Sequence, residues 1–133
     1  MAPNQSFYPN PLAIRILFRN FATVINLFRM NNATVISNIK AIAGKTLPAN
    51  SSLLLYGSRA RGDNRPDSDW DLLILLDKPK LSFKDYDYGY PFREFGWDVG
   101  EEISPHIYTK KQWEEWTFLP YRKNVERDKI VLV

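Results

Sequence analysis

Two short apolar runs constrain the fold of this chain more than any other feature. Residues 53–57 (LLLYG) and 69–77 (DWDLLILLD) are too short and too uniformly apolar to form surface helices. Runs of this kind, bounded by polar turn residues, are typical of strands that are covered on both faces. The segment between them contains Gly62, Asn64 and Pro66, which favour a loop. We therefore predict two buried strands joined by a brief helical turn and a loop.

Helical elements are predicted on both sides of this pair. In residues 32–43 the apolar side chains recur every three or four positions, which predicts a helix with one buried face. Gly44 and Pro48 are expected to end it. Residues 80–100 alternate aromatic and charged side chains, with glycines and a proline among them. We expect a helical or irregular crossover there, and we expect most of its aromatic side chains to pack in the core.

The C-terminal part of the chain predicts further strands. Residues 102–109 (EISPHIYT) predict a third strand, and Pro105 favours an edge position or a bulge. Residues 110–116 predict a short helix, and the last six residues, DKIVLV, predict a final strand. The fold class expected from this order is α/β (α+β), with a short mixed sheet packed against helices.

Length and composition indicate one domain with an N-terminal extension. The 133 residues, 44% of them hydrophobic, suffice for a single core. Residues 1–29 are basic, free of acids and amphipathic, as in transit peptides and membrane-surface helices. A normal first helix follows Met30, so the alternatives for 1–29 are a start-site artefact or a poorly packed extension. We assign 1–29 to a basic N-terminal extension and 30–133 to the domain.

Charge and cysteine content exclude several classes of function. The chain has no cysteine, which excludes disulfides and thiolate chemistry and favours the cytoplasm. Arginines interrupt the most hydrophobic early stretch, so we expect no membrane span. All fifteen acidic residues lie at or after Asp63, which leaves the first half basic. Because the net charge is only +3 and the basic residues are spread out, we do not expect nucleic acid as a partner.

The loop GSRARGDNRPDSDWD, residues 57–71, carries the chemistry. Gly57 permits a sharp turn and a close approach of the backbone to a ligand. Ser58 opens a helical turn, where free N–H groups and a hydroxyl favour phosphate. Arg59 and Arg61 add positive charge and can pair with phosphate oxygens, although a solvated charged face explains them equally well.

Asp69 and Asp71 are expected to form a metal site. They lie two residues apart at the start of a strand, so their side chains point to the same face. Adjacent carboxylates repel each other unless a cation lies between them. Mg²⁺ prefers oxygen ligands and is usually held by one or two carboxylates together with substrate phosphates. A capped turn is the alternative reading, but two carboxylates leading into an apolar strand are an unfavourable start for a core element.

The combination of Gly57-Ser58, a loop and Asp69-x-Asp71 resembles the nucleotidyltransferase superfamily that includes DNA polymerase beta. GSRARG followed by SDWDLLI is similar in particular to the minimal nucleotidyltransferases, and the resemblance covers residues 30–133. It implies a small nucleotidyltransferase fold that binds ATP with Mg²⁺, with two metal ions expected. Gly57, Ser58, Arg59 and Arg61 are then the expected nucleotide-binding residues.

The family usually supplies a third carboxylate from the next core strand, and this position is ambiguous here. Ser104 aligns with the acidic position, and Glu102, two residues earlier, lies on the same face with a longer side chain. We take Asp69, Asp71 and Glu102 as the expected catalytic and metal-binding set. Asp98 and the absence of any third acid remain alternatives. His106, the single histidine, reads as a packing or surface residue rather than a base.

The resemblance implies Mg²⁺-dependent transfer of AMP from ATP to a hydroxyl group. The chain is too short for a separate acceptor domain, so we expect the acceptor site to come from a partner or from a second subunit of a homo-oligomer. The resemblance implies a small helical HEPN-type partner in a toxin–antitoxin pair. One alternative is a nucleotide- or partner-binding module with weak or no catalysis. Another is a nucleotidyltransferase that modifies small molecules of the aminoglycoside type.

Overall fold

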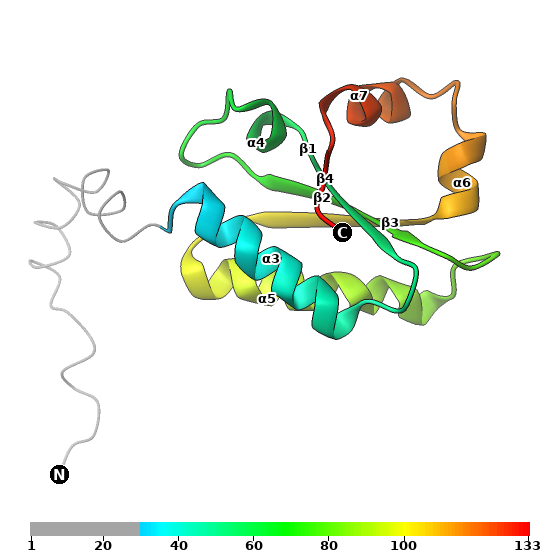
Figure 1. Cartoon of the computed structure of the whole chain (residues 1–133), viewed down its shortest axis with the longest axis horizontal. Helices are drawn as coiled ribbons and strands as arrows, with labels where there is room; N and C mark the ends of the chain where they lie inside the picture. The colour runs from blue at the N-terminus through cyan, green and yellow to red at the C-terminus, as the bar shows by residue number, and fades with distance from the viewer. Residues whose placement is uncertain (1–29) are drawn as a thin grey trace, which may run out of the picture. The chain divides into compact units, whose positions relative to one another are not determined.

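The computed structural model describes residues 30–133, and the expected extension at 1–29 lies outside the described residues. Strands and helices alternate along most of the described chain (Figure 1). In chain order they are α3 (Asn32–Thr46), β1 (Ser52–Tyr56), α4 (Ser58–Arg61), β2 (Trp70–Leu76), the 3₁₀ helix η2 (Phe83–Gly89), α5 (Tyr90–Val99), β3 (Ile103–Thr109), α6 (Lys110–Glu115), α7 (Pro120–Asp128) and β4 (Ile130–Val131).

The four strands form one mixed sheet in the order β3-β2-β1-β4. Strand β1 pairs antiparallel with both β2 and β4, whereas β2 and β3 are parallel. The parallel pair is connected through η2 and α5, as a parallel crossover requires. Pro105 lies in β3 at one edge of the sheet, as predicted, where its missing N–H is tolerated. The α/β fold class with a short mixed sheet is confirmed.

Helices cover both faces of the sheet. Figure 1 shows α3 and α5 on one side and α6 and α7 on the other. On the α6–α7 side, Trp113 and Val125 pack against Leu54, Leu73 and Leu75 of the two central strands. The side chains of β2 are buried from Leu72 to Leu76 without alternation, because both of its faces are covered.

Helix α3 is longer than its sequence predicts. It begins after Asn31, whose side chain accepts a hydrogen bond from Thr34 N at 2.8 Å. It buries Val35, Ile39 and Ala43, which are three of its periodic apolar positions. The expectation that Gly44 ends it is wrong, since the helix continues to Thr46. The helix ends at Leu47, which is extended because the following Pro48 disfavours the helical conformation in the residue before it.

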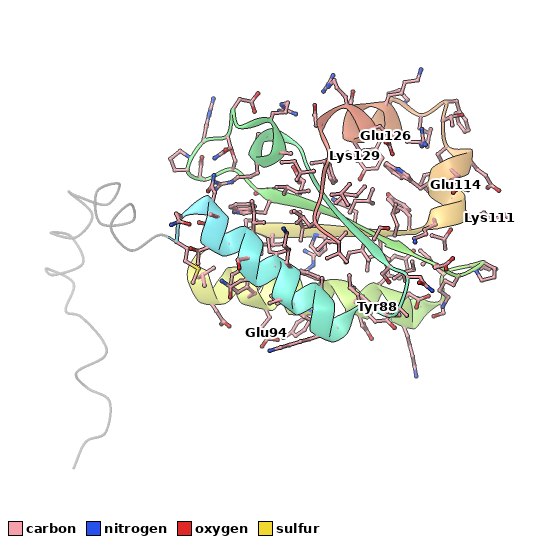
Figure 2. The ribbon with its side chains drawn as sticks, viewed as in Figure 1. Tyr88, Glu94, Lys111, Glu114, Glu126 and Lys129 are labelled. Atoms are coloured by element: carbon pink, nitrogen blue, oxygen red, sulfur yellow. The ribbon has the colours of Figure 1, made fainter. Side chains whose placement is uncertain are left out.

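Helix α7 has almost no apolar periodicity and was not predicted. Val125 is its single buried residue, so tertiary contacts hold it in place. Glu126 accepts a hydrogen bond from Trp113 Nε1 at 2.7 Å and pairs with Lys129 Nζ at 2.6 Å. Glu126 and Lys129 are labelled in Figure 2. The bond from Trp113 joins α7 to α6, and the Lys129 pair lies at the C-terminal end of α7 itself.

The aromatic residues of η2 and α5 correct another expectation. We expected most of them in the core, but Phe83, Tyr86, Tyr90 and Trp97 are each more than half exposed. Phe92 alone among the aromatics of this crossover is fully buried. The reason is geometric, because α5 turns only one side toward the sheet and buries little else there than Phe92 and Gly96. No helix within residues 30–133 is long and apolar enough to cross a membrane.

Candidate functional site

The turn from β1 into α4 brings the backbone against a carboxylate. Gly57 adopts φ 74° and ψ −159°, a region that is almost exclusive to glycine. Its carbonyl accepts hydrogen bonds from Ala60 N at 3.1 Å and Arg61 N at 3.0 Å, which start the short helix. A Cβ atom at Gly57 would collide with Asp71 Oδ2. Gly57 therefore lets the turn lie directly on the Asp71 carboxylate.

The two aspartates of the loop interact with each other. Asp69 is exposed and lies one residue before β2, whereas Asp71 is the second residue of the strand and is half-buried. Burial raises the pKa of Asp71, and the negative charge of Asp69 raises it further. His106 and Arg61 act in the opposite direction. The site thus holds two carboxylates whose mutual repulsion a cation would relieve.

The two arginines of the loop have different surroundings. Arg61 is exposed and forms ion pairs with Asp128 at 2.8 Å and with Asp63 at 3.1 Å. Arg59 is buried, and its guanidinium is hydrogen-bonded to Ser68 O, among other protein acceptors. Of the four residues expected to bind nucleotide, Gly57, Ser58 and Arg61 lie at the turn, whereas the Arg59 side chain points into the protein.

The expected third carboxylate does not join this pair. The parallel register places Ser104 directly opposite Asp71. Glu102 is exposed and precedes β3, where its carbonyl accepts from Trp70 N at 2.8 Å. Asp98 is exposed near the end of α5. Within residues 30–133, no three acidic or histidine side chains lie close enough to hold a metal ion together. Among the described residues, Glu102 therefore does not form a three-ligand metal group with Asp69 and Asp71.

Sequence reasoning missed Glu101, the neighbour of Glu102. Glu101 is 5% exposed and pairs with Arg59 at 3.4 Å. Two adjacent glutamates before a strand have the same side chain, so the sequence does not indicate which of them is buried. The close packing of α5 decides this, since Glu101 N donates to Gly96 O at 2.8 Å.

Aromatic side chains border Asp71 on the α6–α7 side of the sheet. Tyr56, paired with Asp71 in the strand register, accepts a hydrogen bond from Tyr121 Oη at 2.9 Å. Burial is the main cause that raises the pKa of Tyr56, so this phenol stays protonated. His106 is exposed, as its surface reading predicts, with its ring centroid 6.3 Å from that of Tyr56.

A cavity of about 310 Å³ lies along the outer side of β3. Tyr86, Gly89 and Arg93 line it from η2 and α5. The strand contributes residues 105–108, among them His106, which is close enough to Asp71 to influence its pKa. The cavity therefore lies beside the acidic pair, on the side opposite β1 and the Gly57 turn.

The donor set suits a hard divalent cation such as Mg²⁺. Asp69 and Asp71 offer carboxylate oxygens, and the absence of a Cβ at Gly57 lets the turn approach the Asp71 carboxylate directly. Two protein carboxylates are the number that usually holds Mg²⁺ when phosphate oxygens complete its coordination. The residues present therefore fit a metal–triphosphate complex.

Comparisons with known proteins agree with this geometry. Residues 36–133 match the model of the nucleotidyltransferase domain family, which the DNA polymerase beta-like superfamily includes, and the chain belongs to this family. One similar solved structure is described as the crystal structure of a toxin–antitoxin with AMP-PNP. It is 12% identical, has a TM-score of 0.52, and the match covers 74% of this chain and 72% of that one. No curated protein sequence matches the chain significantly.

Proposed function

We propose that this protein is a Mg²⁺-dependent nucleotidyltransferase that transfers AMP from ATP to a hydroxyl group of a partner protein. The observation that carries the proposal is the contact between Gly57 and the Asp71 carboxylate, with Asp69 beside it. It supports a triphosphate on the Gly57-Ser58 turn and Mg²⁺ on the two aspartates. The family membership of residues 36–133 supports the same chemistry.

In the proposed reaction, the acceptor oxygen attacks the α-phosphorus of ATP. A new P–O bond forms, the bond to the β-phosphate oxygen breaks, pyrophosphate leaves, and the hydroxyl proton passes to solvent. Bound Mg²⁺ supplies charge neutralisation at the phosphates. Asp69 and Asp71 would hold the metal, and Ser58 and the backbone at Gly57 would bind phosphate oxygens. Positioning and electrostatics account for catalysis in reactions of this class.

The acceptor is proposed to approach along β3. This strand lies on the far side of Asp71 from the phosphate turn, which is where an in-line acceptor must enter. The cavity beside His106 is lined there by the exposed Tyr86 of η2 and by Tyr108 of β3. Such side chains are enriched in protein interfaces. A protein acceptor, of the helical HEPN type that the resemblance implies, fits this surface.

The experiment uses the full chain with ATP labelled on the α-phosphate or on the γ-phosphate. In the presence of Mg²⁺ and a cell extract, we expect the α-label to reach a protein band and the γ-label not to. Asp69→Asn and Asp71→Asn should each abolish the transfer. Asp77→Asn, at the opposite end of β2, is the matched control and should retain it, since this exposed aspartate lies away from the turn. Transfer that persists in Asp69→Asn would contradict the proposal.

A second candidate function rests on Ser104. Because Ser104 lies opposite Asp71 where the family usually has its third carboxylate, the chain suits a module that binds Mg²⁺ and nucleotide without transferring it. In that case wild type binds Mg²⁺ and ATP, Asp69→Asn abolishes binding, and no α-label is transferred in any extract. Labelling and binding measured together separate the two functions.

A further inference from the structure

The site contains a buried ion pair that the proposed chemistry does not use. Arg59 and Glu101 bury their side chains to 4% and 3% exposure, and Arg59 Nη2 lies 3.4 Å from Glu101 Oε2. Burying two charges costs more than their attraction returns unless other hydrogen bonds complete the arrangement. Arg59 and Glu101 do make such further hydrogen bonds, and these connect the pair to the residues on both sides of Asp69.

The contacts of Arg59 converge on the residues that precede Asp69. Its Nε and Nη2 atoms donate to Ser68 O at 3.2 and 3.1 Å, and Nη2 also donates to Pro66 O at 3.0 Å. These carbonyls belong to an exposed loop that lacks regular structure of its own. The planar guanidinium can hold several acceptors in a fixed geometry, as the flexible ammonium of lysine cannot.

The same guanidinium also fixes the residue that follows Asp69. The Arg59 Cζ atom lies 4.6 Å from the centroid of the Trp70 ring, over its face. Trp70 Nε1 donates to Glu101 Oε2 at 3.1 Å, so Glu101 links the indole and the guanidinium. Arg59 thus donates hydrogen bonds to Ser68, which precedes Asp69, and stacks on Trp70, which follows it.

We infer that Arg59 is a positioning residue that holds Asp69 in place for the metal. Asp69 itself is exposed and lies outside the strand ladder, so the sheet alone does not fix its carboxylate. Clamping the residues on both sides limits the backbone freedom of Asp69 before the metal binds, and such preorganisation supports affinity. The inference rests on the proposed function, since it assigns Asp69 a metal to hold.

Three variants of the full chain separate positioning from general stability. Arg59→Met removes the hydrogen bonds to Pro66 O and Ser68 O and leaves Glu101 buried without this ion-pair partner. Glu101→Gln is the matched control, because the amide oxygen still accepts from Trp70 and Arg59 and the guanidinium keeps its carbonyl acceptors. The double variant Arg59→Met/Glu101→Gln removes both charges. Each is measured for Mn²⁺ affinity by electron paramagnetic resonance, for thermal stability, and for hydrogen exchange of the Ser68 and Trp70 amides without metal.

We expect both variants that lack Arg59 to bind Mn²⁺ about 10–100-fold more weakly, the usual effect of losing a group that orients a metal ligand. Exchange of the Ser68 amide, which donates to Arg65 O at 3.1 Å, should rise about tenfold or more in both. Glu101→Gln should keep its Mn²⁺ affinity within about twofold while its melting temperature falls. The double variant should regain stability relative to Arg59→Met but not affinity.

Several outcomes would overturn the inference. It fails if Mn²⁺ affinity follows melting temperature across the three variants, or if Arg59→Met binds Mn²⁺ as tightly as wild type. It also fails if the loop amides exchange no faster without Arg59. If wild type itself binds no Mn²⁺, the proposed function fails and the metal-positioning role fails with it. The two failures are therefore distinguished by the wild-type measurement.

Discussion

Replacing Gly57 by alanine tests the central contact of the site. The backbone at Gly57, φ 74° and ψ −159°, is one that residues with a Cβ rarely adopt, which costs about 1–3 kcal/mol of folding free energy. The added Cβ would also collide with Asp71 Oδ2. The carboxylate or the turn must then move, and either movement separates the phosphate turn from the metal ligand. We expect Gly57→Ala to weaken Mn²⁺ binding at least about tenfold, as loss of a ligand's orientation does.

Gly62→Ala provides the matched control at the other end of α4. Gly62 also has a positive φ, 84°, so alanine there is strained by about 1–2 kcal/mol. No atom of residues 30–133 lies within 4 Å of a Cβ built at Gly62, so nothing in this part of the chain collides. Both variants should lose stability in urea denaturation, Gly57→Ala the more because of its collision, but only Gly57→Ala should lose Mn²⁺ and ATP affinity in titration calorimetry. Equal Mn²⁺ affinity in the two variants would refute the role given to the Gly57–Asp71 contact.

Further predictions concern packing and charge. Gly44→Ala, within α3 and free of close neighbours, should raise the free energy of unfolding by about 0.5–1 kcal/mol. Gly96→Ala should lower the free energy of unfolding by about 1–3 kcal/mol, because its Cβ would lie 2.6 Å from Glu101 O. If urea denaturation finds Gly96→Ala more stable than Gly44→Ala, the explanations of both variants are wrong. Arg127 and Arg61 lower the pKa of Asp128 to about 2, so its pairing stabilises the fold fully above about pH 4 and is lost as the pH falls towards 2. The difference in melting temperature between wild type and Asp128→Asn should thus be constant above pH 5 and shrink below pH 4, and a difference that grows on acidification would contradict this assignment. At neutral pH the same variant frees Arg61 from a 2.8 Å ion pair, and we expect it to bind ATP more tightly in calorimetry.

The sequence by itself determined the elements whose signals are local. Two apolar runs predict β1 and β2 within one residue of their ends, and the residues that α3 buries are three of its five periodic positions. Covalent spacing and strand alternation fix these features whatever the rest of the chain does.

Only the tertiary structure decided which side chains belong to the site. The register of β3 against β2 places Ser104 beside Asp71, and the pairing register of two segments so far apart in the chain cannot be deduced from either segment alone. Arg59 is buried and Arg61 is exposed, although the two residues have the same side chain and lie two positions apart. Their difference depends on Glu101, forty-two positions away from Arg59, and on how closely α5 approaches β3. Contacts between segments so far apart arise from packing the whole core, and no local pattern specifies them.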